Sequence, residues 1–328
     1  MQSMEYRPLL SVIVAAYNTS KYIQKCLDSI IYQSCSDIEV IIVDDGSTDK
    51  TPQICDSYSA QDSRVKVIHQ ENHGLIFSRL TGAKYSSGDY IMFVDSDDWA
   101  DLDMCKKLLT KAVNTNADLV VCDYIIWGNN TEKYTKCEPP CSADDLLHKI
   151  VQWKFPSVLW NKLYKRELAI KSIERCLGGG NISEDFLISV SCLLFSPTIA
   201  YVPEGLYFYN RNVESSLVLK LSSLGKSLYE GSNNVNRVYA LLADKGIFEE
   251  YKYDFYRLIL NIKTYLLNEG RVKEARSIYP EAHKEIIVFY PITNPLRWIY
   301  YGALNWGTLG WWCFCFFKFM KKHLIARV

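Results

Sequence analysis

Three aspartates follow directly after an apolar run in the segment GDYIMFVDSDDWAD (88–101). Asp95, Asp97 and Asp98 stand where the run of residues 90–94 ends. Helix capping accounts for one such aspartate but not for three, and crowded carboxylates repel one another unless a cation lies between them. Carboxylate and hydroxyl oxygens are the ligands that Mg²⁺ and Mn²⁺ prefer. The spacing therefore predicts a divalent-cation site, with Asp95 and Asp97 on one face of an extended backbone.

Polar residues end two other apolar runs in the same half of the chain. Tyr17 and Asn18 follow SVIVAA, and Asp44 and Asp45 end EVIIVDD (39–45). Aspartates at such a position could accept hydrogen bonds from a base or a sugar.

A second acidic pair, Glu184 and Asp185, precedes the apolar stretch FLISVSCLLF (186–195). Acidic residues favour a helix N-terminus, and Ser183 is a suitable N-cap. On residue types alone, this pair therefore indicates no more than stabilisation of a helix dipole.

The elements that must position these residues alternate regularly. Strands are predicted at 11–17, 39–45, 65–70, 89–97 and 117–127, with a further strand-like stretch at 198–210, and helices are predicted near 20–33, 49–61, 75–86 and 101–114. Strands that are apolar on both faces and separated by helices indicate a parallel sheet covered on both sides. Ligands bind outside the carboxyl ends of the strands in such sheets, so the polar strand ends should meet at one edge.

The ordered set of motifs resembles a family 2 glycosyltransferase of the GT-A fold. The motifs are SVIVAAYN, VIIVDDGSTDKT, SRLTGAKYSSGDYIMFVDSDDW, WNKLYKREL and SEDFLISVSCLL, spread over about residues 9–215. The resemblance implies an α/β fold, with a Rossmann-like, mostly parallel sheet flanked by helices and a C-terminal helical extension. It is strongest to bacterial enzymes that assemble cell-surface polysaccharide. A departure is Ser78-Arg79-Leu80, where relatives often have Ala-Arg-Asn.

The resemblance implies roles for residues at four places. The nucleotide and donor set is Ala16, Tyr17, Asn18, Asp44, Asp45, Gly46, Arg79, Asp95 and Ser96. Asp97, with Asp95, would bind Mn²⁺ or Mg²⁺, and the pair Glu184-Asp185 would supply the catalytic base, with Asp185 favoured. Trp160, Asn161 and Lys162 would line the sugar and acceptor region.

The implied activity is inverting sugar transfer of the hexosyltransferase type. The donor would be a nucleotide-diphospho-sugar, with UDP expected, and the acceptor a hydroxyl of a saccharide or lipid-linked saccharide. An alternative is a catalytically inactive, membrane-bound scaffold of the same fold, whose mark would be a lost metal ligand or base; neither Asp97 nor Asp185 is lost. A Rossmann oxidoreductase is excluded, because no G-x-G-x-x-G follows the first predicted strand.

Composition limits the classes of partner and the cellular compartment that are expected. The 37 basic and 37 acidic residues balance, which argues against a nucleic-acid partner. Eleven scattered cysteines without a C-x-x-C pair indicate free thiols in a reducing cytosol.

The C-terminal third differs from the rest. We predict a catalytic domain at 1–220, a helical extension at 221–295 and a membrane-associating tail at 296–328. Residues 298–317 carry no charge and hold four of the eight tryptophans, and four basic residues follow them: Lys318, Lys321, Lys322 and Arg327. Tryptophan prefers the headgroup boundary and basic residues the anionic cytoplasmic leaflet. We favour an interfacial anchor on the inner face of the cell membrane over a true span or burial against the protein.

Overall fold

The computed structural model describes residues 8–178, 180–195, 197–213, 229–285, 301–307, 309–310 and 312–316. The chain divides into two compact units, Met1–Ser216 and Leu217–Val328.

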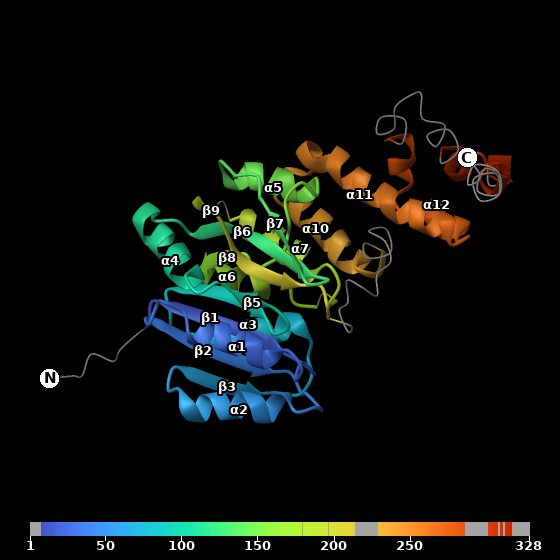
Figure 1. Cartoon of the computed structure of the whole chain (residues 1–328). Helices are drawn as coiled ribbons and strands as arrows, with labels where there is room; N and C mark the ends of the chain where they lie inside the picture. The colour runs from blue at the N-terminus through green and yellow to red at the C-terminus, as the bar shows by residue number, and fades with distance from the viewer. Residues whose placement is uncertain are drawn as a thin grey trace. The chain divides into compact units, whose positions relative to one another are not determined.

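The described part of the first unit is built on a nine-stranded mixed sheet (Figure 1). Its strands are β1 (Leu10–Ala16), β2 (Ile38–Asp44), β3 (Val65–His69), β4 (Tyr90–Asp95), β5 (Trp99–Ala100), β6 (Leu119–Gly128), β7 (Thr131–Thr135), β8 (Lys162–Lys165) and β9 (Ile199–Asn210). They run in the order β3-β2-β1-β4-β8-β6-β9-β5, with β7 paired to β6. The predicted α/β fold with a mostly parallel sheet is confirmed.

The parallel half of the sheet brings the polar strand ends together, as its register shows. In β1, Ala16 lies opposite Asp44 of β2, and Ala15 lies opposite Asp95 of β4. All three strands are almost wholly buried, which explains their continuous apolar runs.

Three strands were absent from the prediction: β5, β7 and β8. β8 is antiparallel to both of its neighbours, β4 and β6, and separates them. It comes from the motif WNKLYKREL and is only four residues long, so its local pattern is too short to indicate a strand.

Helices lie against this sheet and connect its strands (Figure 1). They are α1 (Ile23–Ile31), α2 (Thr51–Gln61), α3 (Leu75–Tyr85), α4 (Met104–Thr115), α5 (Ala143–Val151), α6 (Arg166–Glu174) and α7 (Glu184–Leu193). The first four lie where the periodicity predicts them. Helix α3 packs closely on β1, because a Cβ atom at Gly82 would clash with the side chain of Ile13.

The described part of the second unit is helical. It contains α10 (Ser232–Asp244), α11 (Phe248–Asn268), α12 (Val272–Ser277) and the 3₁₀-helix η1 (Pro280–Glu285). Gly246 and Gly270 have φ angles of 74° and 79°, the left-handed conformation expected of glycine after a helix.

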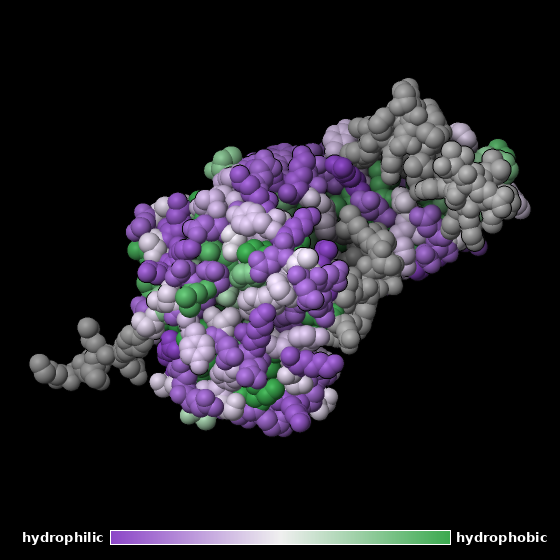
Figure 2. Space-filling view, in the orientation of Figure 1, coloured by the Kyte–Doolittle hydropathy of each residue, from purple (hydrophilic) through white to green (hydrophobic). Residues whose placement is uncertain are grey.

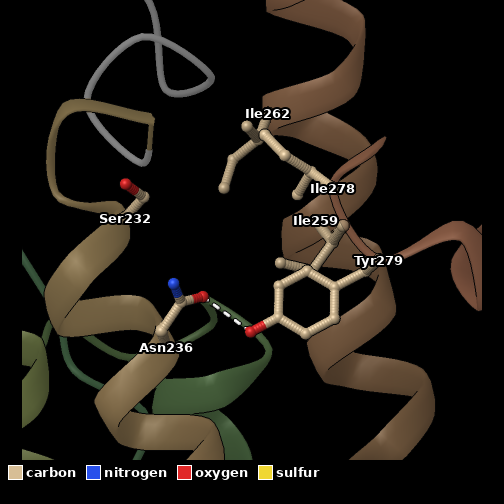
Figure 3. Close-up of a pocket in the computed structure, with 6 residues that line it drawn as sticks. All are labelled: Ser232, Asn236, Ile259, Ile262, Ile278 and Tyr279. Atoms are coloured by element: carbon tan, nitrogen blue, oxygen red, sulfur yellow. Dashed lines mark hydrogen bonds between the residues drawn. The ribbon is translucent and has the colours of Figure 1, made fainter. Parts of the chain in front are cut away.

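A cavity of about 240 Å³ lies within the second unit (Figure 3). Its lining residues are Ser232, Asn236, Ile259, Ile262, Ile278 and Tyr279. The Tyr279 hydroxyl donates a hydrogen bond to Asn236 Oδ1 at 2.6 Å across one side of it. None of these residues belongs to the predicted donor, metal or catalytic set.

The described residues of the tail expose large apolar side chains. Trp306 is 50% exposed, Leu309 67%, Trp312 72% and Phe316 66%. Figure 2 shows, by contrast, a largely hydrophilic visible surface over the first unit. Among the residues described, no helix has both the length and the apolar character needed to cross a membrane.

Candidate active site

The three aspartates at the end of β4 differ in how deeply they are buried. Asp98 is 1% exposed, and its carboxylate accepts hydrogen bonds from the Tyr207 hydroxyl at 2.8 Å and from the Asn210 backbone N–H at 2.7 Å. Asp98 therefore binds strand β9 and is not the helix cap that its sequence position suggests. Asp95 and Asp97 are half-buried instead.

Arg79 gathers three carboxylates around one guanidinium. Its Nη1 donates to Asp185 Oδ1 at 2.6 Å and to Glu184 Oε1 at 3.3 Å, and its Nη2 donates to Asp95 Oδ1 at 3.0 Å. The Arg79 side chain is 2% exposed. Residues from α3, from the end of β4 and from the start of α7 therefore meet at one point.

Burial and mutual repulsion shift the pKa values of these acids. Burial, followed by the charge of Asp185, raises the pKa of Glu184 to about 8, although Arg79 opposes the shift. Burial, followed by the charge of Asp95, raises the pKa of Asp97 to about 6. Neighbouring groups with separated pKa values are typical of acid–base sites.

The start of α7 is not capped as its sequence suggests. Ser183 has a left-handed φ of 61°, and its side chain makes no capping hydrogen bond. Glu184 and Asp185 stand in the first turn and contact Arg79. Dipole stabilisation alone therefore does not account for this acidic pair.

The two aspartates at the end of β2 are hydrogen-bonded to other groups of the protein. Asp45 accepts hydrogen bonds from the backbone N–H of His73 at 3.0 Å and of Gly74 at 2.8 Å, and from Gln70 Nε2 at 2.7 Å. Asp44 contacts His69 Nδ1 at 2.9 Å. Both carboxylates are almost fully buried.

Other residues of the predicted nucleotide and donor set lie at the carboxyl ends of β1 and β2. Gly46 has a φ of 73° and leaves no room for a Cβ atom, which would lie 2.9 Å from the Asn72 nitrogen. Ala16 is buried at the end of β1, whereas Tyr17 is 50% exposed. Asn18 Oδ1 accepts a hydrogen bond from the Thr48 N–H at 2.8 Å, and this joins the two loops.

Ser96 is 5% exposed and lies between Asp95 and Asp97 in the turn after β4. Its side chain is therefore turned into the protein.

The WNK segment lies in the core. Trp160 is 4% exposed and stacks on Tyr207, with ring centroids 4.4 Å apart. Asn161 donates to the Cys122 carbonyl, and Lys162 donates to Asn161 Oδ1 at 2.8 Å. Burial lowers the pKa of Lys162 to about 8. These three side chains are buried and are not on an accessible surface.

The residues after β4 fit a divalent cation. Burial, followed by repulsion from Asp95, raises the pKa of Asp97, and a positive charge beside it would oppose both effects. Within the described ranges, no group of three or more His, Cys, Asp or Glu side chains is arranged to hold a metal ion. Mg²⁺ typically takes only one or two protein carboxylates, and Asp95 and Asp97 could supply them.

Three contacts of this site were absent from the sequence prediction. The ion pairs of Arg79 join residues 105 and 106 positions apart, and no local pattern indicates them. Asn181 Oδ1 accepts a hydrogen bond from the Leu75 N–H at 3.2 Å, so the segment before α7 contacts the start of α3. The motif Ser78-Arg79-Leu80 was the only signal that singled out Arg79.

Solved structures show which class of protein has this fold. The structure of TarS 1–349 from S. aureus in complex with UDP-GlcNAc matches with a TM-score of 0.63 and 19% identity, over 90% of this chain and 81% of that chain. The mannosyltransferase PcManGT from Pyrobaculum calidifontis, in complex with GDP-Man and Mn²⁺, matches with a TM-score of 0.53 and 16% identity, over 94% of this chain and 86% of that chain. The fold is the GT-A fold of nucleotide-sugar transferases.

Sequence similarity identifies the family. The model of glycosyl transferase family 2 matches residues 11–177. EpsH of Bacillus subtilis (strain 168) is 33% identical over 283 residues, which are 83% of this chain and 80% of that protein. The chain belongs to glycosyl transferase family 2, and the predicted glycosyltransferase activity is confirmed.

Proposed function

We propose that this glycosyltransferase moves a sugar, with inversion, from a UDP-sugar to a hydroxyl of a saccharide or lipid-linked saccharide during surface polysaccharide synthesis. The observation that carries the proposal is the cluster in which Arg79 joins Asp95 to Glu184 and Asp185. It brings the proposed metal-binding turn and the proposed base to one guanidinium. A UDP-sugar is the proposed donor because TarS, which shares the fold, binds UDP-GlcNAc.

The nucleotide would lie at the carboxyl ends of β1 and β2. Asp45 is held in place by the N–H groups of His73 and Gly74, so its orientation is set before the donor binds. Gly46 permits close approach of the backbone at this turn. Tyr17 presents an exposed ring beside these groups.

Asp185 would act as the general base. One carboxylate oxygen is bonded to Arg79, and the side chain is 21% exposed, so it can reach an acceptor hydroxyl. General base catalysis contributes about 10²–10⁴ in rate. Asp97 would hold Mn²⁺ or Mg²⁺, which when bound neutralises the charge that develops on the leaving diphosphate.

The tail would place the enzyme on a membrane surface. Trp306, Leu309, Trp312 and Phe316 are exposed, and basic residues follow them in the sequence. Apolar side chains of this size favour the headgroup boundary, and the basic residues favour anionic lipid. A lipid-linked acceptor would be reached from this position.

Two substitutions test the proposed roles. The wild-type enzyme is first screened with UDP-sugars and Mn²⁺ for donor hydrolysis and transfer. Asp97→Ala should lose Mn²⁺-dependent UDP binding in calorimetry, because it lacks the proposed metal ligand. Asp185→Asn should bind UDP with Mn²⁺ normally and transfer sugar about 10²–10⁴-fold more slowly. The exposed Asp144, changed to asparagine, is the matched control and should leave both measurements unchanged.

These measurements distinguish the proposed enzyme from its alternatives. Normal turnover by Asp185→Asn contradicts the base assignment. Nucleotide binding without hydrolysis or transfer, for every donor tried, favours the inactive scaffold instead.

A further inference from the structure

We propose that Arg79 is a positioning residue, which holds the base Asp185 at a fixed distance from the turn after β4. The inference rests on the proposed function, because it takes Asp185 as the base. It assigns Arg79 a role different from contact with the nucleotide.

The geometry of the guanidinium carries this inference. Nη1 bonds to Asp185 at 2.6 Å, while Nη2 bonds to Asp95 at 3.0 Å. The guanidinium group is planar and rigid, so two of its nitrogens fix the separation of two carboxylates. A lysine has a single ammonium group on a flexible stem and cannot impose that separation.

Arg79 is much more deeply buried than two of the carboxylates that it contacts. Arg79 is 2% exposed, whereas Asp185 is 21% and Asp95 29% exposed. The arginine therefore lies behind the carboxylates, which face the accessible side. With both terminal nitrogens bonded to acids, the guanidinium is not presented to a diphosphate.

The helix that carries Arg79 is itself fixed at its start. The Gly74 N–H donates to Asp45, and the Leu75 N–H donates to Asn181 Oδ1. Arg79 lies four residues after Leu75 in α3, about 6 Å at the usual helical rise. Helix α3 is thus bonded to the proposed nucleotide-binding acid at its start and to the proposed base at Arg79.

The inference predicts which kinetic constant changes. Loss of the fixed separation should misplace the base without removing a contact to the donor. A displacement of about 1 Å in a reacting group can cost about 10²-fold in rate. We therefore expect Arg79→Lys to lower kcat by about 10–100-fold while the Kd for UDP with Mn²⁺ changes less than about threefold.

A double-mutant cycle tests it in the full-length enzyme. The variants are Arg79→Lys, Asp185→Asn and the double substitution, each measured for kcat, donor KM and UDP binding. If Arg79 acts through Asp185, the double variant should be no slower than Asp185→Asn alone. Arg64→Lys is the matched control, because Arg64 pairs with Asp62 away from this site. It should change kcat by less than about twofold.

Several results would overturn the inference. A rise in donor KM or UDP Kd of tenfold or more at constant kcat assigns Arg79 to nucleotide contact. Multiplicative losses of kcat in the double variant show that Arg79 acts independently of Asp185. Loss of transfer in Asp185→Asn with normal kcat in Arg79→Lys overturns this inference alone. Full activity of Asp185→Asn overturns the proposed base as well.

A second variant keeps the test informative if Arg79→Lys does not fold. Glu184→Gln preserves the shape of the side chain and leaves the 2.6 Å bond between Arg79 and Asp185. We expect its kcat to fall less than about tenfold. A loss as large as that of Asp185→Asn would identify Glu184 as the base that Arg79 holds, and would overturn the proposal for Asp185.

Discussion

The carboxylates of this enzyme differ in the hydrogen-bond donors and charges that surround them. Hydrogen bonds from the protein lower the pKa of Glu39 although burial opposes them, whereas burial, followed by the charge of Asp95, raises the pKa of Asp97. Glu39 accepts hydrogen bonds from Ser11 Oγ at 2.7 Å, from the Ser87 N–H at 2.6 Å and from Lys66 Nζ at 2.9 Å. Satisfied acids of the first kind stabilise the fold, and acids of the second kind are suited to bind a cation.

Glu39 should make the fold sensitive to acid. Although burial opposes ionisation, the hydrogen bonds from Ser11, Ser87 and Lys66 lower the pKa of Glu39 from 4.5 to about 2. A lowered pKa stabilises the folded state fully above pH 4.5, and this stabilisation is lost as the pH falls towards 2.

We expect Glu39→Gln to reduce the free energy of unfolding at pH 7 by about 1–3 kcal/mol. It should also flatten the dependence of stability on pH below 4.5. Urea unfolding at pH 7 and pH 3 measures both effects, with the 79%-exposed Glu167, changed to glutamine, as control. An unchanged acid dependence would contradict this account of Glu39.

At the scale of elements, β9 is joined to the turn after β4 by one tyrosine. The Tyr207 hydroxyl accepts a hydrogen bond from the Asp95 N–H at 3.1 Å and donates one to Asp98 at 2.8 Å. Its ring stacks on Trp160. The position of the acidic turn therefore depends on a strand more than 100 residues later in the chain.

Tyr207→Phe should keep the stacking and remove both hydrogen bonds. Leaving buried polar groups without a partner costs about 1–3 kcal/mol each. We expect a fall of at least about 1 kcal/mol in the free energy of unfolding, measured by urea denaturation. Tyr85→Phe, at a position 66% exposed, should have no measurable effect. Equal stability of both variants would show that Tyr207 does not hold the turn.

At the scale of the whole molecule, the chain combines a catalytic unit with a helical unit in which the described residues of the tail expose large apolar side chains. The boundary between the units lies after Ser216. The proposed site residues all belong to the first unit, and the exposed tail residues to the second.

Membrane association by the tail can be tested on vesicles of phosphatidylglycerol and phosphatidylcholine. Each large apolar side chain that is buried contributes about 1.5–3 kcal/mol. We therefore expect Trp306→Ala with Trp312→Ala to reduce co-sedimentation at least tenfold. The exposed residues Tyr32 and Tyr85 of the first unit, both changed to alanine, should leave it unchanged. Vesicle binding that survives the tail substitutions would argue against the proposed anchor.

The sequence by itself determined the parallel half of the sheet, the first four helices and the family motifs. Each of these depends on residues close together in the chain, because strand and helix periodicities are local. Tertiary structure alone decided the insertion of β8, the burial of Trp160, Asn161 and Lys162, and the contact of Arg79 with Glu184 and Asp185. Those features join segments far apart in sequence, and a local pattern does not specify which distant partner satisfies a buried charge.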